Sequence, residues 1–167
     1  MTVRSAQLTD LKAIKQIYAY ARKQMKKNGN PSQWGDNRPS EGTIRADIRN
    51  FQSYVITRKT ETCSEICGAF AFIIGEDPTY RILEYGHWLN EAPYGTIHRL
   101  AAGDNAKGIF STCLAWCLAQ IPNIRIDTHR DNLIMRHLLE KNGFKKCGII
   151  YVEDNSPRLA YQKSPDV

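Results

Sequence analysis

One segment, residues 66–74, constrains the fold of this chain more than any other. Its sequence, ICGAFAFII, is an almost unbroken run of apolar residues. Such a run is typical of a central β-strand that is buried on both faces. Because a sheet of this kind must be covered on each side, the rest of the chain has to supply helices for both faces.

Two helices are predicted before that strand. The first follows a short strand at residues 2–5, and its apolar residues repeat every three or four positions, so that they share one face. They are Leu11, Ile14, Ile17, Tyr18 and Ala21. Gly29 and Pro31 end this helix. The second helix begins near Glu41 and turns its isoleucines at positions 44 and 48 inward.

The remaining segments complete a mixed α/β sheet. Strands are predicted at 53–59, 96–102, 124–127, 145–153 and 158–163, and helices at 108–120 and from residue 131 or 132 onward. Residues 75–93, rich in turn residues and aromatics, are predicted to form an irregular excursion. The order β-α-α-β-β-β-α-β-α-β-β has no repeat and no linker, and 167 residues suffice for one core. We therefore predict a single domain over 1–167 with helices on both faces of the sheet.

The charge balance is basic, with 23 Lys and Arg against 17 Asp and Glu. Segments 22–28 and 140–146 carry much of the excess, which is typical of a solvated surface or of a site for a phosphate-bearing ligand. Nucleic acid is not expected, because no helix-turn-helix, zinc-finger or aromatic stacking motif is present. The chain has no apolar run of ~18 residues and no signal-peptide pattern, so we expect a cytoplasmic protein without membrane contact.

Five cysteines occur, in two pairs four residues apart and one single residue. An odd number without a signal peptide predicts reduced thiols. Cys113 and Cys117 lie in the apolar helical pattern GIFSTCLAWCLAQI, which favours buried packing over a zinc site.

Asp127, His129 and Asp131 alternate in the manner of metal ligands. A helix begins directly behind them, however, and Asp131 or Asn132 more simply caps its first turn. Gly143 and Phe144 fit a Schellman ending of the same helix. We therefore expect no metal here.

The order of elements and three stretches resemble the GNAT acyltransferase superfamily, over essentially the whole chain. In IRIDTHRDNLIMRHLLEKNGF, residues 124–144, a strand ends, Asn132 opens the next helix, and the helix closes in Gly-Phe as in the family. HRLAAGDNAKGIF, residues 98–110, resembles the family's strand and pyrophosphate loop. NPSQWGDNRPS, residues 30–40, resembles a bacterial sub-branch with a Gln-Trp loop between the first two helices.

The resemblance implies a GNAT-like fold and an acetyltransferase that uses acetyl-CoA. By the family pattern, the residues that bind coenzyme A are Leu100, Ala101, Ala102, Asn105, Ala106, Lys107, Gly108, Ile109, Phe110 and Asn132. Backbone N–H groups at a helix N-terminus bind phosphates in such a loop, and Lys107 adds a cation. The loop departs from the family because Asn105 replaces Arg or Gln and Phe110 replaces a small residue.

In the family's mechanism an amine attacks the thioester directly, which requires a proton acceptor and a stabilised thiolate. The tyrosine that usually serves the thiolate corresponds to Leu139, which cannot donate a proton. Tyr151 or Tyr161 could replace it, and a structural role in the sheet is the alternative for both. His98 is a candidate base, with a structural hydrogen bond as its alternative, and the excursion offers Glu84, His87 and Glu91 as further candidates.

The acceptor is expected to be a primary amine of a small molecule or peptide. It would bind between the Gln33-Trp34 loop and the excursion, with Trp88 and Tyr94 as further contacts and cation–π attraction from the tryptophans. Hydrophobic anchoring of the loop is the alternative role of Trp34. The alternatives to an enzyme are a catalytically silent coenzyme A-binding GNAT-like protein and a basic binding module, and a homodimer is left open.

Overall fold

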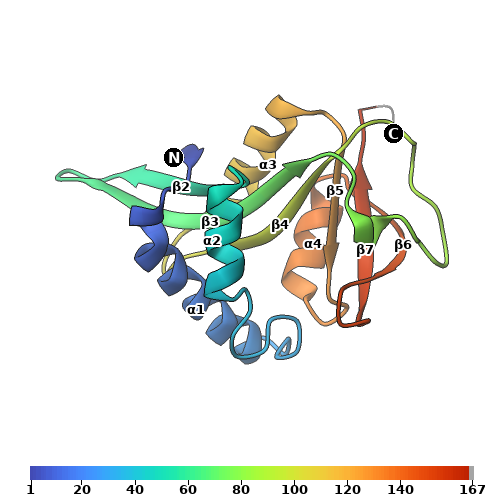
Figure 1. The fold of residues 1–167 in the computed structure, drawn as a ribbon, viewed down its shortest axis with the longest axis horizontal. Helices are drawn as coiled ribbons and strands as arrows, with labels where there is room; N and C mark the ends of the chain where they lie inside the picture. Colours follow the sequence, from blue (N-terminus) through green and yellow to red (C-terminus); the bar gives the residue numbers. More distant parts are fainter. Residues whose placement is uncertain (166–167) are drawn as a thin grey trace. The chain divides into compact units, whose positions relative to one another are not determined.

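The computed structural model describes residues 1–165 and contains the predicted elements in the predicted order (Figure 1). Among these residues, the strands are β1 (Thr2–Ser5), β2 (Ser53–Lys59), β3 (Ser64–Ile74), β4 (Gly95–Ala102), β5 (Ile124–Thr128), β6 (Lys145–Tyr151) and β7 (Pro157–Lys163). The helices are α1 (Leu11–Lys27), α2 (Glu41–Arg49), α3 (Ile109–Gln120) and α4 (Leu133–Lys141). The strands form one sheet in the order β1-β2-β3-β4-β5-β7-β6, with β4 and β5 parallel and β5 and β7 antiparallel. The predicted mixed α/β fold is confirmed.

By their contacts the residues divide into two compact units. The first unit comprises Met1–Phe72 and His98–Trp116, and the second comprises Ile73–Ile97 and Cys117–Val167. The prediction of a single domain stays a prediction. No helix among the described residues has the length and apolar character that crossing a membrane requires.

In the first unit, helices cover both faces of β3. Ala69 packs in a fully buried cluster with residues of α1 and α2. Phe70 and Phe72 point to the opposite face, because successive side chains of a strand alternate. Both rings lie 5.9 Å from the ring of Trp116 in α3. Burial of a phenylalanine contributes about 1.5–3 kcal/mol, so this two-sided packing is a main source of stability in the unit.

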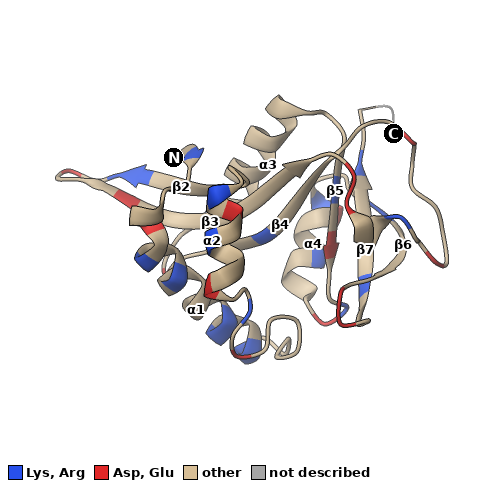
Figure 2. Ribbon diagram, viewed as in Figure 1, with Lys and Arg blue, Asp and Glu red and all other residues tan. Residues whose placement is uncertain are grey.

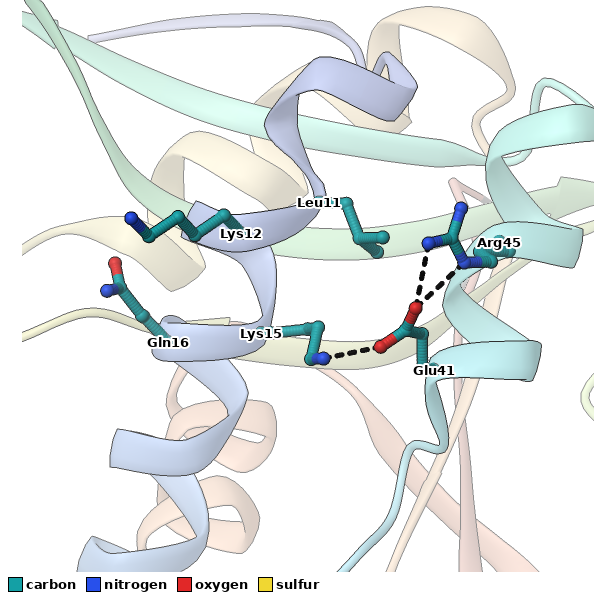
Figure 3. A pocket seen from close by; sticks show the side chains of 6 residues that line it. All are labelled: Leu11, Lys12, Lys15, Gln16, Glu41 and Arg45. Carbon is teal, nitrogen blue, oxygen red and sulfur yellow. Dashed lines mark hydrogen bonds and ion pairs between the residues drawn. The ribbon is translucent and has the colours of Figure 1, made fainter.

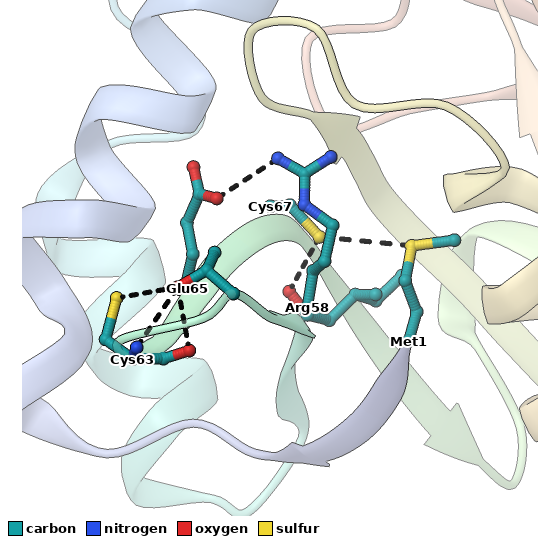
Figure 4. A network of polar contacts seen from close by, with 7 residues as sticks. Met1, Arg58, Cys63, Glu65 and Cys67 are labelled. Atoms are coloured by element: carbon teal, nitrogen blue, oxygen red, sulfur yellow. Dashed lines mark hydrogen bonds and ion pairs between the residues drawn. The ribbon is translucent and has the colours of Figure 1, made fainter.

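Several strand boundaries differ from the sequence prediction by one or two residues; β6, for example, ends at Tyr151 rather than at residue 153. β3 begins at Ser64 rather than at residue 66, because Ser64 and Glu65 pair with Lys59 and Arg58 at the ends of β2 and β3. Arg58 Nη2 donates a 3.1 Å hydrogen bond to Glu65 Oε2 (Figure 4). Exposed polar pairs of this kind extend a strand although the sequence shows no apolar run at those positions.

α1 ends at Lys27, and Gly29 terminates it as predicted. Gly29 has a left-handed φ of +80°, its N–H donates to Lys26 O, and Asn30 N–H donates to Met25 O, which is a Schellman ending. The basic residues of segment 22–28 lie along the C-terminal half of this helix (Figure 2). Its last turn carries two lysines, which complement the helix dipole. These positively charged residues therefore stabilise the end of a surface helix.

In the second unit, the irregular excursion 75–93 is seated firmly on the sheet. Glu84 and Ile149 of β6 form an isolated antiparallel bridge with two N–H···O bonds of 2.9 Å. Tyr80, in a short 3₁₀ turn, is 2% exposed and packs in a buried cluster with Tyr94. The excursion is thus irregular, as predicted, but tied to β6 by main-chain bonds.

Both ends of α4 follow the sequence prediction. Asn132 Oδ1 accepts a 3.2 Å hydrogen bond from Met135 N–H, so that Asn132 is the N-cap. At the other end, Gly143 has φ of +82° and Phe144 N–H donates to Leu139 O at 3.0 Å. The predicted cap and the predicted Schellman ending are both confirmed.

Replacement of Asn132 by alanine should lower the free energy of unfolding by about 1 kcal/mol, because one donor of the first turn loses its acceptor. Chemical denaturation without ligand measures the change. Asn132→Asp, which keeps a capping oxygen, is the control and should stay near the wild type. An alanine variant as stable as the wild type would show that the cap contributes nothing.

Candidate functional site

β4 departs from regular geometry where it leaves its parallel neighbour. It pairs with β5 only at Gly95↔Ile124 and Thr96↔Arg125, although β4 continues to Ala102. Arg99 has a φ of +54°, a left-handed value that is rare for a non-glycine residue and typical of a local bulge. Main-chain N–H and C=O groups that no longer pair with a neighbouring strand need other hydrogen-bond partners. An extended ligand can provide such partners.

The loop after β4 is held in place by its own main chain. Gly103 N–H donates a 2.9 Å bond to Cys67 O of β3, and a Cβ at Gly103 would stand 3.3 Å from that oxygen. Asn105 and Gly108 have φ of +53° and +75°. Asparagine and glycine are the residues that tolerate this conformation best. The two left-handed residues turn the chain directly into α3.

The N-terminus of α3 can bind an anion through its main chain. The first N–H groups of a helix have no partner inside the helix, and they carry the positive end of the helix dipole. The first turn of α3 contains no acidic residue. Among the loop side chains, Lys107 and Asp104 offset each other in charge. Anion binding would therefore depend chiefly on backbone donors.

An ion pair lies beside the bulge of β4. Arg99 Nε and Nη2 donate to Asp47 Oδ2 of α2 at 3.0 and 2.8 Å. The two side chains are 23% and 14% exposed. Burial raises the pKa of the Asp47 carboxyl, although the charge and hydrogen bond of Arg99 act in the opposite direction. Neither residue was singled out from the sequence, because a single Asp inside a helix pattern carries no signal.

Solved structures with a similar fold are acetyltransferases. A GNAT-family acetyltransferase of Streptococcus agalactiae is 29% identical, with a TM-score of 0.86 over 98% of this chain and 94% of that one. One of Listeria monocytogenes is 20% identical, with a TM-score of 0.68 over 97% and 93%. A phosphinothricin acetyltransferase of Sinorhizobium meliloti, solved with acetyl-CoA, is 13% identical, with a TM-score of 0.65 over 99% and 91%.

The chain has the GNAT fold. Neither the protein-family models nor the curated proteins give a match. The Streptococcus agalactiae acetyltransferase, at 29% identity, nevertheless confirms the resemblance and supports acetyl transfer as the general activity. The finer prediction of a sub-branch with a Gln-Trp loop stays a prediction.

The departures of this chain from the GNAT phosphate loop have a structural explanation. Asn105 adopts the left-handed conformation, which asparagine tolerates. Phe110 is 7% exposed, so its large side chain is buried rather than placed over the helix N-terminus. Lys107 is exposed and can approach a phosphate. The main-chain geometry of a GNAT loop is therefore compatible with these residues.

Leu139 occupies the position where GNAT enzymes usually carry the tyrosine, and it is fully buried. Of the two tyrosines that could replace it, Tyr161 is also fully buried, with its hydroxyl near Glu140. The other, Tyr151, donates a 2.9 Å hydrogen bond to Glu84 Oε2. This bond raises the pKa of the Tyr151 hydroxyl. The structure thus brings together two predicted catalytic residues, Glu84 and Tyr151, as one hydrogen-bonded pair.

The predicted acceptor residues of the second unit have structural partners. Arg125 lies between two rings, 4.1 Å from the Trp88 centroid and 3.9 Å from the Tyr94 centroid. Trp88 Nε1 donates to Tyr80 O, and the Tyr94 hydroxyl accepts from Asp77 N–H. One face of each ring is therefore occupied by a cation of the protein itself. Their contact with an acceptor stays a prediction.

The Gln33-Trp34 loop is anchored on α1. Trp34 meets Tyr18 edge-on at 5.6 Å and packs against the buried cluster of the first unit. Gln33 Oε1 accepts a 2.8 Å bond from Asn30 Nδ2. These contacts favour the anchoring role of Trp34, and its role toward an acceptor stays a prediction.

The remaining first-unit candidate, His98, is half-buried on β4 next to Arg99.

The alternating residues at the end of β5 and just after it have structural partners. Asp127 accepts a 2.8 Å hydrogen bond from the buried Tyr80 hydroxyl. His129 Nδ1 accepts from Asp131 N–H at 3.2 Å, and burial lowers the pKa of this histidine. No group of three metal-binding side chains occurs within residues 1–165.

A shallow pocket of about 450 Å³ lies on the outer surface of α1 and α2 (Figure 3). It is lined by Leu11, Lys12, Lys15, Gln16, Glu41 and Arg45. Glu41 accepts hydrogen bonds from both Lys15 and Arg45, and the latter bond measures 2.9 Å. None of the predicted site residues lines this pocket. The carboxylate of Glu41 already pairs with two cations that also line it.

Of the five cysteines, only Cys63 should react rapidly with a thiol reagent in the native protein. Cys63 is exposed, the other four are buried, and burial raises the pKa of Cys67 and Cys147. Because the thiolate is the reactive form, both burial and a raised pKa slow the reaction of a cysteine with the reagent. A titration with a chromogenic disulfide should show one fast thiol, and all five after unfolding. Stoichiometric zinc in elemental analysis, or several fast thiols, would contradict this expectation.

Proposed function

We propose that this protein is an acetyl-CoA-dependent N-acetyltransferase acting on a primary amine of a small molecule or peptide. The proposal rests on three features that follow one another from β4 to α3. They are a strand with a bulge, a loop with left-handed residues, and a helix whose first turn carries no acidic side chain. An extended pantetheine arm fits the main chain of Leu100 to Ala102 in such a strand, and a pyrophosphate fits the backbone donors of residues 105–110.

Acetyl-CoA would supply the acetyl group as an activated thioester. The main chain of β4 would orient the thioester, and Lys107 would approach the pyrophosphate as an exposed cation. An acceptor amine held beside β4 would then attack in a near-attack geometry, which is the chief contribution an enzyme can make to such a reaction.

Turnover of acetyl-CoA against a panel of amines tests this proposal. The panel includes polyamines, amino acids, aminoglycosides and peptide N-termini, and release of the free thiol is measured. The proposal predicts thiol release that depends on at least one amine. Coenzyme A binding without any turnover would instead indicate the catalytically silent alternative, which the buried Leu139 permits but which the acetyltransferase neighbours do not favour. Absence of coenzyme A binding would indicate a basic binding module.

A further inference from the structure

The Asp47–Arg99 pair has an unusual hydrogen-bond geometry. An arginine fork that serves only to fix a carboxylate commonly uses both carboxylate oxygens in parallel. Here Nε and Nη2 of Arg99 both lie within 3.0 Å of the same oxygen, Asp47 Oδ2. Neither of these two contacts uses Oδ1. An ionised carboxylate can accept several bonds, so Asp47 retains capacity for another donor.

The surroundings of Asp47 are suited to a cation. Burial raises the pKa of the Tyr18 hydroxyl, while the charge of Arg99 acts to lower it and that of Asp47 to raise it, so this hydroxyl lies within electrostatic reach of the pair. Trp34 stands edge-on to Tyr18. Arg99 and His98 are the charged or titratable neighbours contributed by β4. Because burial raises the pKa of Asp47 in spite of Arg99, one arginine does not offset the cost of desolvating this carboxylate. A second cation would lower that cost further.

The position of the pair connects it to the proposed reaction. Arg99 is the left-handed residue of β4, and it directly precedes Leu100, where the proposed thioester contacts begin. An amine held by Asp47 would therefore lie in the same unit and beside the same strand as those contacts.

We propose that Asp47 binds the ammonium group of the acceptor through Oδ1, with Arg99 orienting the carboxylate, so that the acceptors are cationic aliphatic amines. The bound nitrogen would lose one proton to water before it attacks the thioester carbonyl, and the C–S bond would then break with coenzyme A leaving as the thiolate. The inference rests on the proposed function and defines the acceptor side of the same site. Asp47 contacts the substrate, and Arg99 is a positioning residue that acts through Asp47.

The test compares variants with the aliphatic amine that the panel turns over fastest. Asp47→Asn should raise the KM of this amine about 10- to 100-fold, the range expected for loss of a hydrogen bond between charged groups. kcat should change less, and the Kd of coenzyme A should change less than about twofold. Asp47→Glu, which keeps the charge but moves it by one methylene, should give a KM several-fold above that of the wild type and below that of Asp47→Asn.

Glu41→Gln is the matched control. Glu41 lies on the same helix and also pairs with two cations, but it belongs to the outer pocket of α1 and α2. Its removal should leave the KM of the amine unchanged. An unchanged KM in Asp47→Asn would overturn the inference, as would equal losses in amine KM and coenzyme A affinity, because a purely structural pair predicts that result.

If Asp47→Asn does not fold, Asp47→Glu decides the question. Moving the carboxylate by one methylene should raise the KM of the amine several-fold without changing the Kd of coenzyme A, and an unchanged KM overturns the inference. Failure of the proposed function gives a different result, since the wild type would then turn over no amine. If the protein turns over an amine but substitution of Asp47 does not change its KM, the proposed function stands and only the role of Asp47 in binding the amine is refuted.

Discussion

Gly86→Ala should destabilise the protein by about 3 kcal/mol, a large effect for the addition of one methyl group. A Cβ at Gly86 would stand 1.8 Å from Cys147 O of β6, and this atom belongs to the main chain and cannot rotate away. The added group must therefore push the excursion off β6 and strain the bridge between Glu84 and Ile149. The free energy of unfolding from denaturant titration measures the loss.

Gly42→Ala is the control for this prediction, with the opposite sign. Gly42 lies in α2, and the nearest atom to an added Cβ is Ser40 Oγ at 3.7 Å, an ordinary contact. Alanine there should stabilise the helix by up to about 1 kcal/mol. If Gly86→Ala is as stable as the wild type, the excursion is not seated on β6 as described.

Lys107→Glu should weaken coenzyme A binding about 10- to 100-fold, because it replaces a cation near the proposed pyrophosphate position by an anion. The loop also contains Asp104, so the variant would place two acidic side chains beside the N-terminus of α3. Calorimetric titration with coenzyme A measures the Kd, and the loss should decrease as salt is added.

Lys23→Glu makes the same change in net charge on the exposed surface of α1 and is the matched control. It should change the Kd less than about twofold. Equal losses in both variants would show that coenzyme A responds to the net charge of the protein rather than to the loop, and the phosphate site would then lie elsewhere.

Regular elements could be predicted from the sequence because their signals are local. The apolar run at 66–74 predicted a strand covered on both faces, and β3 carries Ala69 toward α1 and α2 and Phe70 toward α3. Asn132 and Gly143 act within one turn of their own helix, so the caps of α4 were also predictable.

Features that depend on long-range contacts could not be predicted. Asp47 and Arg99 are 52 positions apart, and no periodicity connects them. Likewise, nothing local marks Gly86 as a close contact of β6, because the approach depends on the path of the excursion. The pairing of Glu84 with Tyr151 arises from the same path. Sequence patterns therefore predicted the scaffold but not the side-chain contacts between distant segments, and the assignment of residues 105–110 as a phosphate loop stays a prediction.

The central claim is that the segment from β4 to α3 binds coenzyme A, and a calorimetric titration of the wild-type protein with coenzyme A tests it most directly. The account predicts saturable binding at one site per chain, and a melting temperature that rises with ligand concentration because the ligand binds only the folded state. No heat of binding and no shift of the melting temperature at millimolar coenzyme A would contradict it.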